Sequence, residues 1–124
     1  MILLDTSFLI ELLSEREAAV KKAHAIDVEP KAISSVTLYE LFIGAQPLKK
    51  VKDIDELCET MEIIAPDKRI VKKAAFLQLT LRQKGNEIPA FDALIAATAL
   101  EVNAVLLSKD DHFKRVDSLH VAGW

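Results

Sequence analysis

Short apolar runs alternate with amphipathic segments along the whole chain. A run of about four to five apolar residues predicts a buried β-strand, whereas apolar positions three and four residues apart predict an amphipathic helix. The predicted strands are residues 1–4, 31–34, 62–65 and 104–108, with a short last strand at 119–121. The predicted helices are residues 6–13, 15–26, 35–44, 48–61, 67–84 and 93–102.

This order of elements predicts the fold class. Strands that alternate with helices indicate a parallel sheet with helices on both faces. The predicted strands are continuously apolar, as expected when both faces of a sheet are covered. A length of 124 residues suits one domain with a substantial core. We therefore predict a single α/β domain over residues 1–124, with a central parallel sheet of four to five strands.

Two of the predicted helices carry patterns that bear on packing. In the third helix, Val36, Tyr39 and Ile43 are predicted to form the buried apolar stripe. Glu40 would then lie along the edge of that stripe. The helix 93–102 is rich in alanine, and its small side chains predict close packing against the sheet or another helix.

Composition limits the class of protein. A hydrophobic fraction of 51% with 28% charged residues is typical of a globular domain. No apolar run approaches the roughly 18 residues that span a membrane, and Asp5 interrupts the first run too early for a signal peptide. The single cysteine, Cys58, rules out an internal disulfide and suits a reducing compartment. We therefore predict a cytoplasmic protein without a membrane partner.

The charge distribution bears on nucleic-acid binding. A net charge of −3 argues against broad electrostatic wrapping of nucleic acid. Nine of the sixteen basic residues fall between Lys49 and Lys84, so any basic face is predicted on the two helices of that segment. Lys49, Lys50 and Lys52 could contact phosphates, but acids follow them directly, and a solvated helix face is the simpler interpretation.

Four acids occupy related positions on this predicted frame. Asp5 ends the first strand, and Asp110 lies just beyond the fourth. Asp92 begins a helix, and Glu40 lies early in the helix that follows the second strand. All four should lie near one edge of a parallel sheet, where ligands gather in α/β proteins. Converging carboxylates repel one another unless a cation neutralises them, and their oxygens suit a divalent metal such as Mg²⁺.

Each acid also has a structural alternative. Asp5 and Asp92 could be helix caps, Asp110 an ordinary turn residue and Glu40 a solvated helix residue. At the first helix, Thr6 or Ser7 is predicted to cap the free N–H groups. The prediction of a site therefore depends on convergence of the acids.

Four segments of the chain together resemble the PIN-domain ribonucleases, and most closely the VapC-type toxins of prokaryotic toxin–antitoxin pairs. The resemblance extends over the whole chain, and the segments come in the order of that family. They are residues 3–7 (LLDTS), 35–41 (SVTLYEL), 88–97 (IPAFDALIAA) and 107–113 (LSKDDHF).

The resemblance implies a metal-dependent endoribonuclease that uses Mg²⁺ or Mn²⁺. By position, it implies that Asp5 and Asp92 are the core metal ligands and that Glu40 is a third acid, which binds the metal or orients water. Asp110 matches the fourth acid. The family resemblance further implies supporting roles for three hydroxyl residues near these acids: Thr6, Ser7 and Ser108.

The last segment departs from the family pattern, which is usually Thr-x-Asp-x-Asp-Phe. Ser108 replaces the threonine, and His112 stands in place of the second acid. Asp111 is therefore an alternative to Asp110, but Asp110 keeps the spacing to Ser108 and Phe113 and is the residue we predict to point inward. A histidine beside acids can assist proton transfer, but the resemblance gives His112 no such role.

The resemblance also implies partners: an RNA substrate, a VapB-like antitoxin that covers the active-site groove, and a second copy in a homodimer. Two other functions fit parts of the sequence. A phospho-signalling receiver domain also carries acids at strand ends and a lysine that Lys109 could match, but it has an acidic pair after its first strand, where this chain has Asp5 alone. The other alternative is a catalytically inactive PIN-like binding module, against which the complete set of acids argues.

Overall fold

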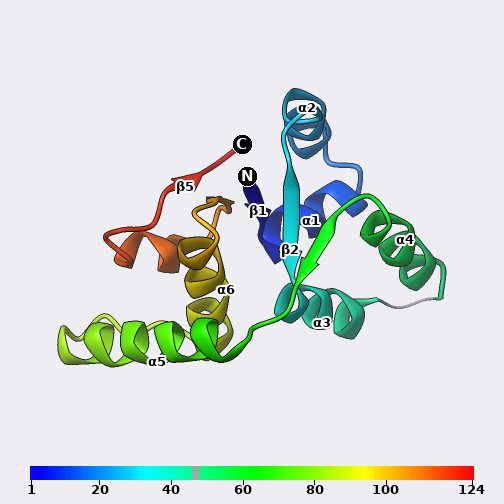
Figure 1. The fold of residues 1–124 in the computed structure, drawn as a ribbon. Coiled ribbons are helices and arrows are strands. Elements are labelled where there is room, and N and C mark those ends of the chain that lie inside the picture. Colours follow the sequence, from blue (N-terminus) through cyan, green and yellow to red (C-terminus); the bar gives the residue numbers. More distant parts are fainter. Residues whose placement is uncertain (46–47) are drawn as a thin grey trace.

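The computed structural model describes residues 1–45 and 48–124 of the chain, and it contains a five-stranded parallel sheet (Figure 1). The strand order is β3-β2-β1-β4-β5, and all four neighbouring pairs are parallel. This confirms the predicted fold class. The strands are β1 (Ile2–Leu4), β2 (Lys31–Ser34), β3 (Glu62–Ile64), β4 (Val105–Leu107) and β5 (Val121–Ala122).

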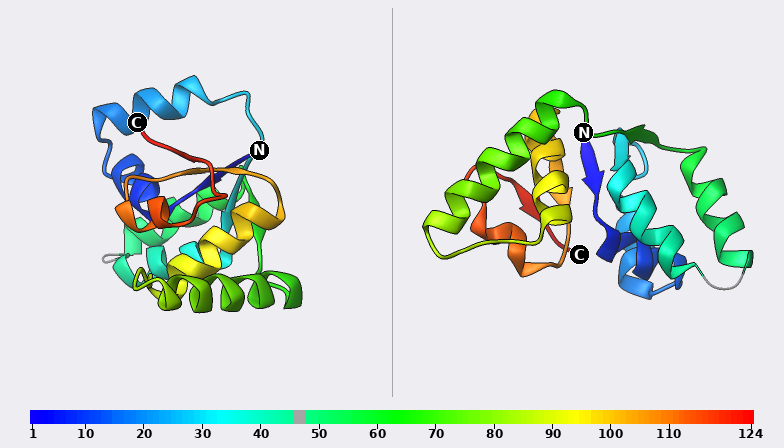
Figure 2. Two further views of the ribbon diagram at one scale, coloured as in Figure 1. Left: turned by 90° about the vertical axis from the view of Figure 1, so that its left-hand side faces the viewer. Right: turned by 90° about the horizontal axis from the view of Figure 1, so that it is seen from below.

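Helices cover both faces of the sheet, as the views of Figure 2 show. Consecutive strand residues point to opposite faces, so Leu3 packs into one core and Leu4 into the other. The core around Leu3 is closed by the last two α-helices, and the core around Leu4 by the first four. The helices are α1 (Thr6–Leu13), α2 (Glu17–Ala25), α3 (Ser35–Gly44), α4 (Leu48–Cys58), α5 (Lys68–Gln83) and α6 (Ala90–Glu101), and a 3₁₀ helix, η1, spans Asp111–Arg115.

Four of the five alanines of α6 are buried between α5 and the sheet, which confirms the predicted close packing. Ala93, Ala96, Ala97 and Ala99 are each at most 1% exposed, and they share a core with residues of α5. Side chains of this size let the α6 backbone approach its neighbours closely. The site residue Asp92, in the first turn of α6, is thereby held by a rigidly packed element.

The predicted stripe of α3 was wrong. Tyr39 and Ile43 are 55% and 62% exposed, whereas Thr37 and Leu41 are the buried residues of this helix. The helix carries apolar residues on several sides, so periodicity could not select the face that packs. Leu41 packs with Phe8 of α1 in the core around Leu4, and that contact decides how α3 is rotated.

The connections place the topological switch point of the sheet at the carboxyl ends of β1 and β4. The chain leaves β1 and β2 through helices on one face, and it passes from β3 to β4 through α5 and α6 on the other. Because β1 and β4 are neighbours, the direction of winding changes between them, which is where open α/β sheets bind ligands. No helix in the described parts of the chain is long and apolar enough to cross a membrane.

Candidate active site

Asp5 ends β1 with its carboxylate almost completely buried, at 5% exposure. Its Oδ2 accepts hydrogen bonds from the hydroxyls of Ser7 at 3.0 Å and Ser108 at 2.7 Å. Asp5 occupies the N-cap position of α1, but its side chain makes no capping hydrogen bond. The alternative that Asp5 serves as a helix cap is therefore wrong, and its second oxygen, Oδ1, is left for another ligand.

The hydroxyls that follow Asp5 contact acids rather than the backbone of α1. Ser7 donates to Asp5, and Thr6 donates to Oε1 of Glu40 at 2.7 Å. The prediction that Thr6 or Ser7 caps α1 was wrong, because α1 begins at Thr6 and Asp5 occupies its N-cap position. The Thr6 contact joins α3 to the end of β1 and holds Glu40 at the edge of the sheet where Asp5 lies.

Asp92 lies in the first turn of α6, three residues after the N-cap residue Pro89. Its side chain is only 15% exposed. Burial raises the pKa of Asp92 above its ordinary value, and the negative charges of Asp110 and Asp5 raise it further, while a hydrogen bond with His112 acts in the opposite direction. Asp5 is thus close enough to Asp92 for the two carboxylates to repel one another.

The turn after β4 orients Asp110 and Asp111 differently. Asp110 Oδ1 accepts a hydrogen bond from the backbone N–H of His112 at 2.9 Å, so Asp110 caps η1 as well as facing the site. Asp111 pairs with Lys114 at 2.9 Å, and its side chain is 84% exposed. The predicted preference for Asp110 as the inward-pointing acid agrees with this geometry.

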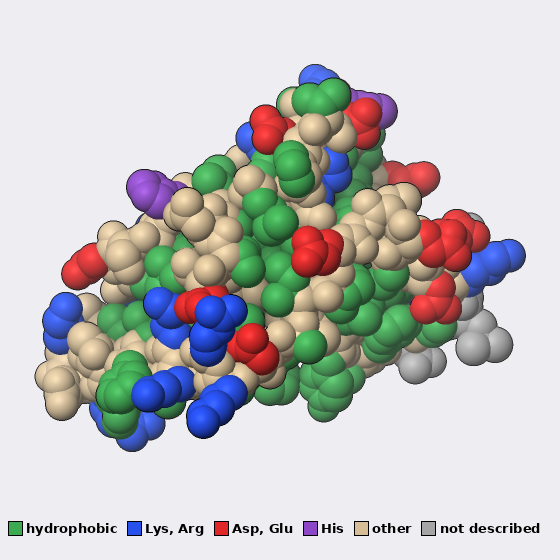
Figure 3. Space-filling view, viewed as in Figure 1, with side chains coloured by type: hydrophobic (Ala, Val, Ile, Leu, Met, Phe, Trp, Pro, Cys, Tyr) green, Lys and Arg blue, Asp and Glu red, His purple; other side chains and the backbone are tan. Residues whose placement is uncertain are grey.

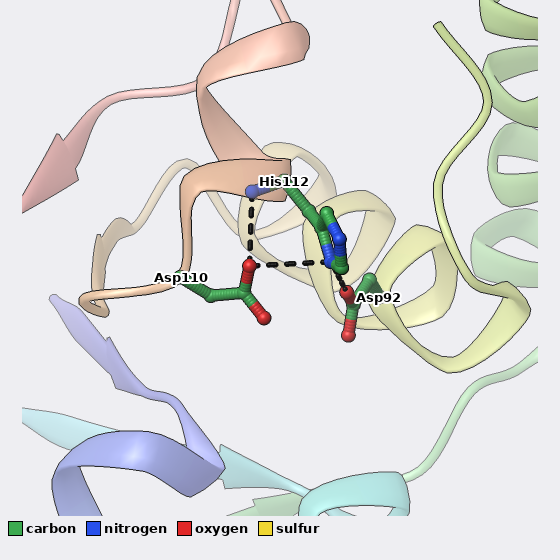
Figure 4. Close-up of side chains that lie close together, drawn as sticks. All are labelled: Asp92, Asp110 and His112. Carbon is green, nitrogen blue, oxygen red and sulfur yellow. Dashed lines mark hydrogen bonds and ion pairs between the residues drawn. The ribbon is translucent and has the colours of Figure 1, made fainter.

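His112 lies between the two acids, a position that sequence reasoning did not predict. Its Nδ1 is 2.8 Å from Oδ2 of Asp92 and 3.2 Å from Oδ1 of Asp110 (Figure 4). The signal was present in the sequence, since His112 stands where the family pattern has its second acid. A residue that replaces the second acid of this turn is expected to lie in the same site as the first acid, Asp110.

The structure brings three of these side chains into one cluster. Donor atoms of Asp92, Asp110 and His112 all lie within 4.8 Å of one another, and in the described residues this is the group whose geometry could hold a metal ion. Asp5 lies outside that limit but acts on Asp92 by charge, and Glu40 is joined to the site through Thr6. A cation relieves the repulsion among crowded carboxylates, so these residues fit a divalent metal ion.

Basic side chains, Lys and Arg, gather over α5 (Figure 3), in agreement with the predicted position of a basic face. Two of them, Arg69 and Lys73, pair with Glu101 of α6 at 3.5 and 3.6 Å. The side chain of Lys49, which belongs to the predicted cluster at the start of α4, lies outside the described residues.

Comparison with known proteins agrees with this fold. The family model of the PIN domain matches residues 2–119. A relative from Methanocaldococcus jannaschii, ribonuclease VapC1, is 30% identical over 116 residues, which cover 93% of this chain and 80% of the relative. The chain belongs to the PIN domain family and, within it, to the VapC ribonucleases.

Solved structures extend the similarity to three dimensions. One is a crystal structure of VapBC2 from Rickettsia felis bound to a DNA fragment from the VapBC2 promoter. It matches with a TM-score of 0.90 at 26% identity, and the match covers 100% of this chain and 99% of the Rickettsia felis chain. VapBC-5 from Mycobacterium tuberculosis, a member of the VapBC family of toxin-antitoxin systems, matches with a TM-score of 0.73 at 26% identity, covering 98% and 94%. Family membership excludes the receiver-domain alternative.

Proposed function

We propose that the protein is a metal-dependent endoribonuclease, the toxin of a toxin–antitoxin pair, that hydrolyses phosphodiester bonds of RNA. The convergence of Asp92 and Asp110, with Asp5 beside them, at the switch point of the sheet carries this proposal. Relatives named as ribonucleases and similar structures of toxin–antitoxin complexes support it. The same convergence argues against an inactive binding module, since a binding surface gains nothing from acids that repel one another.

The proposed cofactor is Mg²⁺ or Mn²⁺, held by Asp5, Asp92 and Asp110. When bound, the ion supplies a positive charge that makes water more acidic and stabilises charge on the phosphate. Carboxylate oxygens are the ligands these hard cations prefer. An acidic site would otherwise repel the RNA backbone, so activity should require the metal.

The supporting residues position the acids. Ser7 and Ser108 hold Oδ2 of Asp5, so that Oδ1 is fixed for a ligand. Thr6 holds Oε1 of Glu40, which leaves the other carboxylate oxygen to accept a proton from water or to bind the metal. We propose Glu40 as the acid that orients the attacking water.

Two protein partners complete the proposal: a VapB-like antitoxin that covers the acidic groove, and a second copy of the chain. Similar solved structures named VapBC support the antitoxin. For the homodimer, the support is exposed apolar surface, since the rings of Tyr39 in α3 and Phe91 in α6 pack edge to face and are 55% and 41% exposed. Light scattering on the purified chain tests the homodimer, and a monomer at micromolar concentrations would contradict it.

A cleavage assay tests the proposed activity. Structured RNA is incubated with the protein plus Mg²⁺ or Mn²⁺, with a chelator, and with the variants Asp5→Asn and Asp92→Asn. We expect discrete RNA fragments whose formation needs the metal. In either variant the cleavage rate should fall on the order of a hundredfold or more, because even residues that only hydrogen-bond to metal ligands contribute ten- to a hundredfold to activity.

Asp111→Asn is the matched control, since it makes the same chemical change on an exposed side chain. It should cleave like the unmodified protein. Cleavage that persists with chelator, or in Asp5→Asn, would contradict the proposed site. Absence of cleavage with every metal, in protein shown to be free of antitoxin, would favour the binding module.

A further inference from the structure

His112 is placed to be more than a neighbour of the acids. Its ring comes from the first turn of η1 and reaches α6, so it bridges the two elements that carry Asp110 and Asp92 (Figure 4). Its backbone N–H is fixed by Asp110 Oδ1, and the N–H of Asp110 is fixed in turn by Ser108. These hydrogen bonds position the backbone of His112, and the two contacts of Nδ1 with Asp92 and Asp110 orient its ring.

We propose that His112 is a metal ligand of this site, contributing Nδ1 beside one carboxylate oxygen each from Asp92 and Asp110. This inference rests on the proposed function, and it specifies a mixed nitrogen and oxygen donor set where the family pattern has an acid. The resemblance of the chain to PIN-domain ribonucleases does not supply this role.

The separations between donor atoms fit adjacent positions of an octahedron. Ligands about 2.1 Å from a metal and at right angles to each other lie about 3 Å apart. Nδ1 lies 2.8 Å from Asp92 Oδ2 and 3.2 Å from Asp110 Oδ1. With these separations, the three atoms can bind one ion after small side-chain adjustments. The metal would replace the proton that joins Nδ1 to the carboxylates.

Exposure of the cluster leaves room for the remaining ligands. The side chains of His112 and Asp110 are 38% and 37% exposed, whereas that of Asp92 is 15% exposed. One side of the cluster is thus closed by protein and the other is open to water and to a phosphate group. A metal bound there would keep solvent ligands, as hydrated divalent ions require.

A nitrogen donor changes the choice of metal. Imidazole suits transition ions such as Fe²⁺, Ni²⁺ and Zn²⁺, whereas carboxylates and water suit Mg²⁺ and Mn²⁺. We therefore expect this chain to favour Ni²⁺ over Mg²⁺ more strongly than the variant His112→Asp, which restores the family's acid. The ratio of the Mg²⁺ Kd to the Ni²⁺ Kd should fall on the order of tenfold in that variant.

Electron spin-echo spectroscopy of the Mn²⁺-loaded full chain tests the inference without any measurement of activity. A coordinated imidazole nitrogen modulates the echo of Mn²⁺. The chain has three histidines, and His24 and His120 are exposed, in α2 and just before β5. We expect the nitrogen modulation in the unmodified protein, in His24→Gln and in His120→Gln, and its loss in His112→Gln and His112→Asp.

The outcomes separate this inference from the proposed function. Mn²⁺ bound without nitrogen modulation, or modulation that survives in both His112 variants, would overturn the ligand role and leave the nuclease standing. No Mn²⁺ binding by the unmodified chain would overturn both. If His112→Gln fails to fold, histidine labelled with ¹⁵N in the His24→Gln and His120→Gln proteins still assigns the signal, because each control removes one competing ring.

Discussion

The hydroxyl of Ser108 donates a 2.7 Å hydrogen bond to Oδ2 of Asp5, although 103 positions separate the two residues in the sequence. The oxygen of the same hydroxyl accepts the backbone N–H of Asp110 at 3.0 Å. The first contact follows from the parallel pairing of β1 with β4, which brings the ends of these strands together, whereas the second is local to the turn after β4. Ser108 thus fixes the acid that ends one strand relative to the acid that follows the other.

Removal of this hydroxyl should loosen the site. We expect Ser108→Ala to lower the free energy of unfolding by about 1–3 kcal/mol, because a buried carboxylate loses a donor. RNA cleavage should fall as well, since Asp5 and Asp110 are no longer held together. Ser108→Thr keeps the hydroxyl and should retain most of both properties. Urea denaturation and a cleavage assay on the two variants check this, and equal behaviour of alanine and threonine would contradict it.

The raised pKa of Asp92 predicts a pH dependence of stability. Burial is the main cause, with Asp110 and Asp5 adding to it, so ionised Asp92 is disfavoured in the folded protein. Stability should therefore fall as pH rises from the ordinary value of 3.8 to the raised pKa, and the loss persists at neutral pH. Asp92→Asn should reduce this dependence and raise the melting temperature of the metal-free protein at pH 7.

Added metal should reverse the order of melting temperature between the unmodified chain and Asp92→Asn. Mg²⁺ or Mn²⁺ binds the folded state only, so it should raise the melting temperature of the unmodified chain and have little effect on Asp92→Asn. Melting curves with and without metal, from pH 4 to pH 8, test both effects. If Asp92→Asn is less stable than the unmodified chain in the absence of metal, the contact of Asp92 with His112 outweighs the repulsion between Asp92 and the other carboxylates.

Local patterns were sufficient to predict most of the fold. The runs at residues 1–4, 31–34 and 62–65 are β1, β2 and β3 to within one residue, because short apolar runs bounded by polar residues have few other structures. The last strand lies at Val121–Ala122, slightly later than predicted. The buried face of α3 was not predictable, because it depends on contacts with α1 that are distant in sequence.

The candidate site was predictable to the level of strand ends and no further. Asp5 and Asp110 follow neighbouring parallel strands, so topology alone brings them close. The directions of side chains depend on hydrogen bonds that the sequence does not encode locally. The sequence predicts that Thr6 and Ser7 support the acids, but it does not predict that Thr6 contacts Glu40. It also does not predict that η1 places the ring of His112 between two acids.

Asp110 and Asp111 provide a matched pair for the acidic turn. We expect Asp110→Asn to weaken metal binding and to lower kcat/KM for a defined RNA by about ten- to a hundredfold or more. Asp111→Asn removes an exposed pair with Lys114 and should change the free energy of unfolding by less than about 0.5 kcal/mol, with cleavage unchanged. Metal titration calorimetry and steady-state cleavage measure both variants. A larger loss in Asp111→Asn would mean that the turn rearranges when RNA binds.

A last prediction concerns Thr37, whose side chain is completely buried in α3. Its Oγ1 has no hydrogen-bond partner among the residues that the structure describes. A buried hydroxyl without a partner is unfavourable by about 1–3 kcal/mol, and valine has nearly the same shape. We therefore expect Thr37→Val to raise the free energy of unfolding by about 1 kcal/mol without a change in cleavage.

Thr98 is the control for this prediction, because it is equally buried but donates to the carbonyl of Leu94 at 2.7 Å. Thr98→Val leaves a hydrogen bond unmade and should stabilise the protein less than Thr37→Val, or destabilise it. Urea denaturation measures the free energy of unfolding of both variants, which make the same chemical change at buried positions of two helices. If Thr37→Val destabilises the protein as much as Thr98→Val does, the hydroxyl of Thr37 has a partner, such as a buried water molecule, that stabilises α3.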